Sequence, residues 1–492
     1  MRRKEKNRTL REILVEDYAS EGKSIARVEG KVVFIEGAVP GDKIDVRLTK
    51  SKKDWAEGKA IHFHSYSPDR VDPFCEHFGV CGGCKWQMLP YQDQLKYKER
   101  EVAAHLKRIG KIDLPEALPI AGADETRYYR NKLEFTFSNR RYFTQEELAL
   151  KKASVQPQPA IEGEKTNIFS GIPDEPALGF HVPGYFDKVI DINSCHLQDE
   201  PSNAIRNFVR DYALKKGYSF YNLRAHEGWL RTMIVRTATT GEVMVNLCFG
   251  YDDELERDDL LGALHRAFPA ITTILYTINP KKNDSIHDLD PQIFHGSGFI
   301  SEKLGDYLFK IGPKSFFQTN TRQAEKLYTI TRDFAELTGK EILYDLYCGT
   351  GSIGIFCSSH TKKIIGVEVV EEAIRDAQIN AAANHVQDAQ FFSGDVIDIC
   401  TDDFFAKHGR PDVIITDPPR AGMHPALVEK LLEIEAPRIV YVSCNPATQA
   451  RDLQLLDIKY KVEKLQAVDL FPHTHHIENV VALILRDKSH QI

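Results

Sequence analysis

The C-terminal part of the chain repeats one pattern, and this pattern restricts the possible folds more than any other feature of the sequence. From about residue 311 onward, short β-prone runs alternate with helix-like segments. The runs are "EILYDLY", "KKIIGVEV", "AQFFSGD", "PDVIITDPP", "RIVYVSC" and "NVVALILR". This alternation predicts βαβ units and a doubly wound, Rossmann-like parallel sheet. The carboxyl ends of its strands would meet along one edge, where such sheets bind ligands.

The first of these strands leads into a glycine-rich turn. "DLYCGTGSIGIF", residues 345–356, joins the strand to a helix through Gly349, Gly351 and Gly354. This spacing fits NAD as well as S-adenosylmethionine. A phosphate-binding lysine does not follow the glycines, which argues against an ATP-cleaving loop. Methyl transfer is the better fit.

Carboxylates end the next three predicted strands in order. Glu368 ends the second strand, where a carboxylate can accept hydrogen bonds from both hydroxyls of a ribose. Asp395 ends the third strand, where it can accept from an adenine amine, and Asp417 ends the fourth. Each carboxylate alone could equally be a helix N-cap or a turn residue. The ordered series favours a cofactor crevice.

The fifth strand ends in a cysteine instead. A buried structural cysteine usually lies among apolar residues, whereas Cys444 comes where the strand turns. Arg420 follows Asp-Pro-Pro, and an aromatic residue there would have suggested methylation of an exocyclic amine. We therefore expect Cys444 to add to carbon 6 of a pyrimidine, so that carbon 5 can attack the methyl group of S-adenosylmethionine. Glu478, just before the last strand, is the expected base that removes the carbon-5 proton.

The N-terminal region has a different pattern. Residues 11–63 alternate short strand-like runs with turns, which predicts a small barrel. The stretch "EGKSIARVEGKVVFIEGAVPGDKI" resembles a TRAM domain, an OB-like RNA-binding module. The resemblance implies a basic face for single-stranded RNA, although a barrel that only holds domains together remains an alternative. We expect this barrel over residues 1–65, a central α+β domain over 66–310, and the catalytic domain over 311–492.

Nine cysteines in a chain this long do not indicate a disulfide framework, and their spacing points to metal binding or catalysis. Cys75, Cys81 and Cys84 lie in the glycine-rich "CEHFGVCGGCKWQ", and Cys195 is the candidate for a fourth ligand. Thiolates bind zinc and iron-sulfur clusters, both of which prefer four protein ligands in structural roles. The alternatives of zinc, an iron-sulfur cluster and no metal are all open at this point.

The charge and hydropathy of the chain restrict where the protein can be located in the cell and what it can bind. The net charge of −7 argues against a protein that coats nucleic acid over its whole surface, but residues 85–111 carry seven basic and three acidic residues on a helical pattern. These charges are either a solvated face or a local RNA contact. Without a long apolar run or a signal-peptide core, we expect a cytoplasmic protein that does not bind membranes. The polar stretch 141–177 indicates a surface insertion with no assigned chemistry.

Several segments together resemble the RNA 5-methyluridine methyltransferases, in particular the TRAM-bearing, iron-sulfur type that acts on 23S ribosomal RNA. They are the barrel, "CEHFGVCGGC", "SFFQTN" at 315–320, "DLYCGTGSIG", "DPPRAG", "VSCNPATQARDL" and "HHIENV". The resemblance implies Cys444 as nucleophile, Glu478 as proton acceptor, and a closed [4Fe-4S] cluster on the four cysteines. It also places four residues in the cofactor and base pocket: Gln318, Tyr347, Glu368 and Asp417. Ser352 stands where the family often has Asn, so we assign it no binding role.

Two alternatives compete with this interpretation. A transfer-RNA uridine methyltransferase would share the catalytic end, but that family usually lacks the barrel and the cysteine cluster. A catalytically idle RNA-binding or assembly factor would not need both Cys444 and Glu478. We expect RNA as the partner, with a uridine in a 23S ribosomal RNA loop as the target, because one transfer-RNA loop would hardly require an added barrel and cluster domain. We expect no obligate protein partner.

Overall fold

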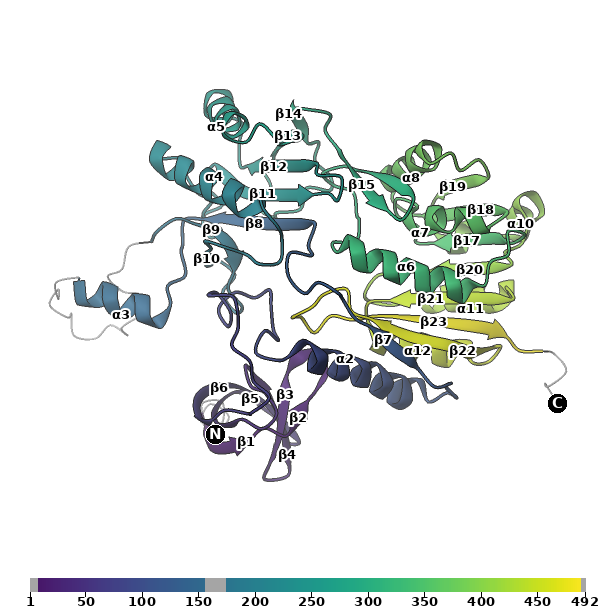
Figure 1. Ribbon diagram of the computed structural model, residues 1–492, viewed down its shortest axis with the longest axis horizontal. Helices are drawn as coiled ribbons and strands as arrows, with labels where there is room; N and C mark the ends of the chain where they lie inside the picture. The colour runs from purple at the N-terminus through teal and green to yellow at the C-terminus, as the bar shows by residue number, and fades with distance from the viewer. Residues whose placement is uncertain (1–7, 155–173, 488–492) are drawn as a thin grey trace.

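The computed structural model describes residues 8–154 and 174–487, which form three main sheets (Figure 1). Much of the expected insertion at 141–177 lies outside the described residues. Its described part includes α3 (Gln145–Ser154), which lies at the outer edge of the molecule in Figure 1.

The N-terminal sheet has six strands that curl around an apolar cluster. Alternate side chains of the strands, among them Val33, Ile35, Ile44 and Val46, form that cluster. The strand order is β1-β5-β6-β4-β3-β2, and a short helical turn, η1 (Ser20–Gly22), follows β2. The bounds are β1 (Thr9–Leu14), β2 (Asp17–Tyr18), β3 (Ser24–Val28), β4 (Lys31–Glu36), β5 (Lys43–Ser51) and β6 (Trp55–Ser65). The predicted small barrel is confirmed.

The second sheet has seven strands in the order β10-β9-β8-β11-β12-β13-β14 and is mainly antiparallel. Helices α4 (Ser202–Lys216) and α5 (Glu254–Ala267) contribute to its apolar core. The strands are β8 (Lys132–Ser138), β9 (Ala177–His181), β10 (Val189–Asp191), β11 (Leu230–Thr237), β12 (Val243–Phe249), β13 (Thr273–Ile278) and β14 (Gln292–His295). This mixture of a sheet with separate helices is the predicted α+β arrangement.

The third sheet has eight strands in the order β19-β18-β17-β20-β21-β23-β22-β7. The first five are parallel, as predicted. Their bounds are β17 (Ile342–Leu346), β18 (Lys363–Glu368), β19 (Ala389–Ser393), β20 (Val413–Thr416) and β21 (Arg438–Ser443). The prediction of a wholly parallel sheet is wrong beyond β21. There β23 (Glu478–Leu485) lies between β21 and β22 (Tyr460–Val468) and is antiparallel to both, because the 469–477 loop reverses the chain between the last two strands.

Helices cover both faces of this sheet. One face packs on α6 (Thr321–Ala335), α7 (Ser352–Phe356), α8 (Glu371–Ala383) and the hairpin of β15 (Ile300–Leu304) and β16 (Tyr307–Ile311). The other packs on α2 (Tyr91–His105), its continuation η2 (Leu106–Gly110), α9 (Val396–Ile399), α10 (Asp402–His408), α11 (Pro425–Ile434) and α12 (Pro446–Leu456). A short turn, η3 (Ser358–His360), follows α7. The predicted doubly wound fold is confirmed.

An early segment of the chain completes the C-terminal sheet. Strand β7 (Leu118–Ala121) pairs in parallel with β22, and α2 packs against α12 beneath it. The sequence predicted the basic residues of α2 as either a solvated face or a local RNA contact, but Lys98 of this helix is fully buried. Lys98 is therefore not available at the surface of the protein.

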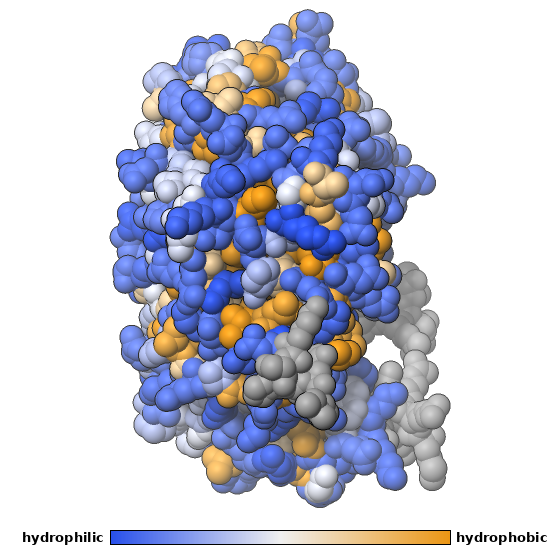
Figure 2. Space-filling view, turned by 90° about the vertical axis from the view of Figure 1, so that its right-hand side faces the viewer, coloured by the Kyte–Doolittle hydropathy of each residue, from blue (hydrophilic) through white to orange (hydrophobic). Residues whose placement is uncertain are grey.

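Hydrophobic side chains form small separate groups on the side of the molecule shown in Figure 2, which is mainly hydrophilic. Within residues 8–154 and 174–487, a helix long and apolar enough to cross a membrane is absent.

Candidate active site

The turn after β21 fixes Cys444 beside the segment that follows β20. Asn445 caps α12 by accepting a hydrogen bond from the Ala447 amide at 3.1 Å, and its side-chain amide donates to the Arg420 carbonyl at 3.0 Å. Thr448 also donates to that carbonyl, at 3.4 Å. One cap residue thus ends the cysteine strand, starts the next helix and holds Arg420 next to it.

The carboxyl groups of Glu478 and Asp417 lie close enough to Cys444 to change the pKa of its thiol. Partial burial, followed by the charges of Glu478 and Asp417, raises the pKa of Cys444 to about 11, while Arg420 opposes the shift. The free thiol is therefore protonated at neutral pH. The structure brings together Cys444 and Glu478, as the sequence predicted, together with Asp417.

Glu478 is the first residue of β23 and pairs with Val468 across the hairpin. Its side chain is buried, and burial, reinforced by the charge of Asp417, raises its pKa well above the ordinary value. Burial likewise raises the pKa of Asp417 to about 7. These carboxyl groups hold protons more strongly than exposed ones, so each can accept a proton once it is ionised.

The glycine-rich turn after β17 leaves room for a ligand. Tyr347 and Gly349 both have left-handed backbone conformations, with φ of 61° and 53°. A side chain at Gly349 would meet no atom within 4 Å, whereas one at Gly351 would stand 3.0 Å from the Phe391 ring. The turn is thus tightly packed beneath and open above Gly349. The Gly349 amide donates to Glu368 at 3.3 Å, which joins the turn to the end of β18.

The other residues that were predicted to bind the cofactor differ in how they contact their surroundings. The charges of Asp395 and Glu368, added to burial, raise the pKa of Tyr347, so these three side chains are neighbours. Asp395 also caps α9 by accepting from the Ile397 amide at 2.9 Å. Gln318 is buried in the segment between β16 and α6, where its backbone carbonyl accepts a hydrogen bond from the side-chain amide of Asn131 at 2.9 Å.

Asp345 belongs to the site although the sequence pattern did not predict a role for it. This carboxylate is fully buried at the end of β17, where one oxygen accepts from the Gly354 amide at 2.9 Å and the other has no partner within the described chain. Burial raises its pKa to about 7. In the sequence, its position four residues before Gly349 was the sign that it could belong to the site. An unpaired buried oxygen beneath an open turn fits a site built for a polar ligand.

The four predicted metal ligands line one cavity. Cys75, Cys81, Cys84 and Cys195 surround a space of about 360 Å³ that is otherwise largely apolar. In the part of the chain that the structure describes, no three His, Cys, Asp or Glu side chains are arranged to hold a single metal ion. A zinc ion would draw its sulfur ligands to about 2.3 Å. The four thiols around one cavity are a donor set that zinc or an iron-sulfur cluster could use.

The Rossmann-like sheet, its open glycine turn and the acidic strand ends form the kind of crevice that a methyltransferase uses to bind S-adenosylmethionine. Residues 292–486 match the family model described as tRNA (Uracil-5-)-methyltransferase, and residues 4–61 match the TRAM domain. An RNA methyltransferase of Bacteroides thetaiotaomicron, described as uncharacterized, is 52% identical over 95% of this chain and 100% of its own length. The chain belongs to the family of RNA uracil-5-methyltransferases.

A second relative and a solved structure extend the comparison. An RNA methyltransferase of Chlorobaculum tepidum is 38% identical over 95% of both chains. The structure of Pyrococcus abyssi tRNA (uracil-54, C5)-methyltransferase in complex with S-adenosyl-L-homocysteine is similar with a TM-score of 0.71 and 28% identity, over 96% of this chain and 99% of that one. A transfer-RNA enzyme therefore has a counterpart for nearly this whole chain. The presence of N-terminal regions therefore does not by itself separate ribosomal from transfer-RNA enzymes.

The electrostatics of Cys444 predict opposite effects of two substitutions. At pH 8, Asp417→Asn removes a negative charge and should speed alkylation of Cys444 by iodoacetamide on the order of tenfold, whereas Arg420→Gln should slow it. Mass spectrometry of the Cys444 peptide measures the rates. At pH 5.5 Asp417 is already neutral, because its pKa is about 7, so Asp417→Asn should change little. Equal rates for all three proteins at pH 8 would contradict this arrangement.

Proposed function

We propose that the protein methylates carbon 5 of a uridine in RNA through a covalent adduct with Cys444. The observation that carries this proposal is the meeting of Cys444, Glu478 and Asp417 at the strand edge that also bears the glycine turn. A thiol and a buried carboxyl group at one site supply the nucleophile and the proton acceptor that substitution at carbon 5 requires.

The steps follow from these groups. The Cys444 thiol gives its proton to solvent, and the resulting thiolate adds to carbon 6 of the uracil, which leaves carbon 5 as an enolate carbon. S-adenosylmethionine supplies the methyl group, which carbon 5 takes as S-adenosylhomocysteine leaves. The Glu478 carboxylate then removes the carbon-5 proton, the double bond between carbons 5 and 6 re-forms, and the thiolate leaves. Burial raises the pKa of Glu478, so this carboxyl group binds a proton more strongly than an exposed one and accepts the carbon-5 proton once it is ionised.

The groups around the glycine turn would hold the methyl donor. We assign Glu368 to the ribose hydroxyls and Asp395 to the adenine amine, the latter with the carboxylate oxygen that does not cap α9. Tyr347, Gln318 and Asp417 complete the pocket. The inward-facing Asp345 supports the turn from beneath through the Gly354 amide.

The proposed target is a uridine in a 23S ribosomal RNA loop. A uracil inside a duplex hides carbon 6, so the target must be flipped or unpaired, and the N-terminal barrel can hold the strand beside it. Transfer RNA is a second candidate, because the similar Pyrococcus abyssi enzyme acts on uracil 54 of transfer RNA and spans almost the same length.

We also propose that the cysteine cavity holds a [4Fe-4S] cluster with Cys75, Cys81, Cys84 and Cys195 as ligands. The four thiols surround one largely apolar space, and burial is the largest influence on each of their pKa values, so bound iron would be needed to keep them ionised. The cluster would be structural, because four protein ligands leave no iron open for chemistry.

Substitution of the two catalytic residues should interrupt the reaction at different steps. Cys444→Ala should abolish methylation while leaving S-adenosylmethionine binding, because only the nucleophile is lost. Glu478→Gln should accumulate a covalent RNA adduct, since the carbon-5 proton then stays in place. Denaturing gels with labelled RNA detect the adduct, and RNA containing 5-fluorouridine should trap the wild-type enzyme in the same way. Methylation by Cys444→Ala would exclude the covalent mechanism.

The choice of RNA can be tested directly. The enzyme is incubated with tritiated S-adenosylmethionine and either protein-free 23S RNA or bulk transfer RNA, both from cells that lack it. We expect label in 23S RNA, with binding that weakens as salt increases because backbone contacts dominate affinity. Label only in transfer RNA would establish the second candidate and overturn the first.

The cluster proposal predicts colour and composition. Protein purified without oxygen should be brown and contain about four irons and four sulfides per chain. Cys195→Ser should lose the colour, whereas Cys248→Ser, which changes a buried cysteine elsewhere in the central sheet, should retain it. Metal analysis and the absorption spectrum decide the question. Stoichiometric zinc without iron would refute the cluster.

A further inference from the structure

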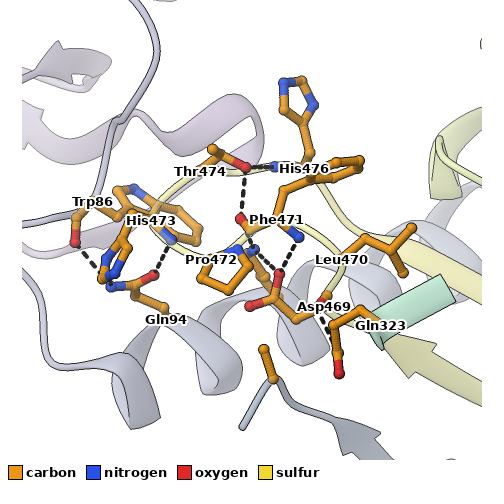
Figure 3. A network of polar contacts seen from close by, with 12 residues as sticks. Trp86, Gln94, Gln323, Asp469, Leu470, Phe471, Pro472, His473, Thr474 and His476 are labelled. Carbon is orange, nitrogen blue, oxygen red and sulfur yellow. Dashed lines mark hydrogen bonds and ion pairs between the residues drawn. The ribbon is translucent and has the colours of Figure 1, made fainter. Parts of the chain in front are cut away.

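The loop that leads into Glu478, residues 469–477, accepts hydrogen bonds at five successive carbonyl oxygens. Figure 3 shows the contacts of this loop with Gln94 and Gln323. Hairpin loops usually face solvent, whereas the residues that donate to this one come from four separate parts of the chain. The bonds are Gln323 to the Asp469 carbonyl (2.8 Å), Asn320 to Leu470 (2.9 Å), Lys98 to Phe471 (3.2 Å), Tyr129 to Pro472 (3.0 Å), and the Lys85 and Trp86 amides to His473 (2.8 and 3.0 Å).

Lys98 of α2 makes the strongest of the contacts to this loop. Its ammonium group lies 2.6 Å from the Asp469 carboxylate, and both side chains are completely buried. Asp469 in turn accepts from the Phe471 amide at 3.0 Å and from the Tyr91 hydroxyl at 2.9 Å. A buried ion pair costs much of its attraction in desolvation, so the geometry that it imposes matters more than any net stability.

Gln94, one turn earlier on α2, holds the middle of the loop. Its side-chain oxygen accepts from the His473 amide at 2.8 Å, and its nitrogen donates to the carbonyls of Trp86 and Leu89, each at 3.0 Å. His473 has a left-handed backbone with φ of 64°, which is unfavourable for a residue other than glycine. Gln94 is fully buried and is placed to maintain this conformation.

The far end of the loop reaches the reacting groups. Arg420 donates to His476 at 3.1 Å, and Glu478 follows two residues later. In residues 8–154 and 174–487, no side chain donates a hydrogen bond to the Glu478 carboxyl group. The direction of that group is therefore set by its backbone and packing, and hence by the loop that precedes it.

We propose that Lys98 and Gln94 are positioning residues for the proton-removal step, because they fix the 469–477 loop and through it the carboxyl group of Glu478. The Lys85 and Trp86 amides, which directly follow Cys84, extend this fastening to the cysteine cavity. The inference rests on the proposed function and adds that α2 controls one step of the reaction. Glu478 directly follows the loop, so removal of the carbon-5 proton depends on the loop most directly, whereas the loop reaches Cys444 through the contact between His476 and Arg420.

The test uses Lys98→Met in the full-length enzyme with ordinary RNA and labelled S-adenosylmethionine. Displacement of a reacting group by about 1 Å can cost on the order of 100-fold in rate. We expect turnover to fall by about that factor while a methylated, covalent RNA–protein adduct accumulates on denaturing gels. Gln94→Leu should give the same adduct to a smaller extent, because it leaves the ion pair in place.

A matched control separates positioning from general damage. Arg231 is also a buried cation that holds a loop, donating to the carbonyls of Asn279 at 2.7 Å and Asn283 at 3.0 Å in the central region. Arg231→Met should lower activity only in proportion to the folded fraction and accumulate no adduct. If Lys98→Met folds poorly, Lys98→Met combined with Asp469→Leu removes the unpaired charge and should still accumulate the adduct.

The outcomes distinguish this inference from the proposed function. If 5-fluorouridine RNA does not trap the wild-type enzyme, the covalent mechanism itself is wrong. If it does, but folded Lys98 and Gln94 variants form no more adduct on ordinary RNA than Arg231→Met, the positioning role is refuted and the mechanism stands.

Discussion

The buried contact between Lys98 and Asp469 joins an early helix to a late loop, and the arrangement of the three regions depends on it. Through α2 it fixes the side of the catalytic sheet on which β7 and β22 pair. The barrel meets the same place, where the Trp86 indole donates to the Gly22 carbonyl at 3.3 Å and the barrel turn packs against His475. The barrel, the cysteine loop and the catalytic edge therefore converge at one point of the molecule (Figure 1).

The catalytic edge combines groups whose charges conflict. Cys444, Glu478 and Asp417 would repel one another if all were ionised, and burial strengthens that repulsion. Burial raises the pKa of all three groups, so each of them binds its proton more strongly than it would in water. Because oxidants and electrophiles react with thiolates, a protonated Cys444 is protected until a substrate occupies the site. The same burial that makes Cys444 harder to ionise thus protects its sulfur from oxidation.

The parts of the site that local sequence determines were predictable. The glycine spacing located the turn at Gly349, and the carboxylates at strand ends located Glu368 and Asp417. The ends of the last two predicted strands located Cys444 and Glu478, which lie close together. Each of these positions depends only on a strand and the residues next to it. Asp395 shows the limit of such reasoning. A carboxylate before a helix has the same sequence pattern whether it caps the helix or binds a ligand, and here it does at least the first.

Contacts between distant parts of the chain were not predictable in this way. In the sequence Lys98 is one of several basic residues on a helix, and only the fold reveals that its partner is Asp469. Strand β22 was missed, and the short β7 joins the C-terminal sheet although nothing in its own residues indicates that sheet. Pairings over such separations depend on the whole packed structure.

The pairing of β7 with β22 also has a consequence for the protein during its synthesis. The glycine turn and the first parallel strands leave the ribosome before β22, the 469–477 loop and Glu478 exist. The apolar faces of α2 and β7 stay uncovered until β22 has been made. Closing contacts over such distances is slow and exposes the chain to aggregation. A nascent chain can therefore form the glycine turn before the 469–477 loop and Glu478 have been made.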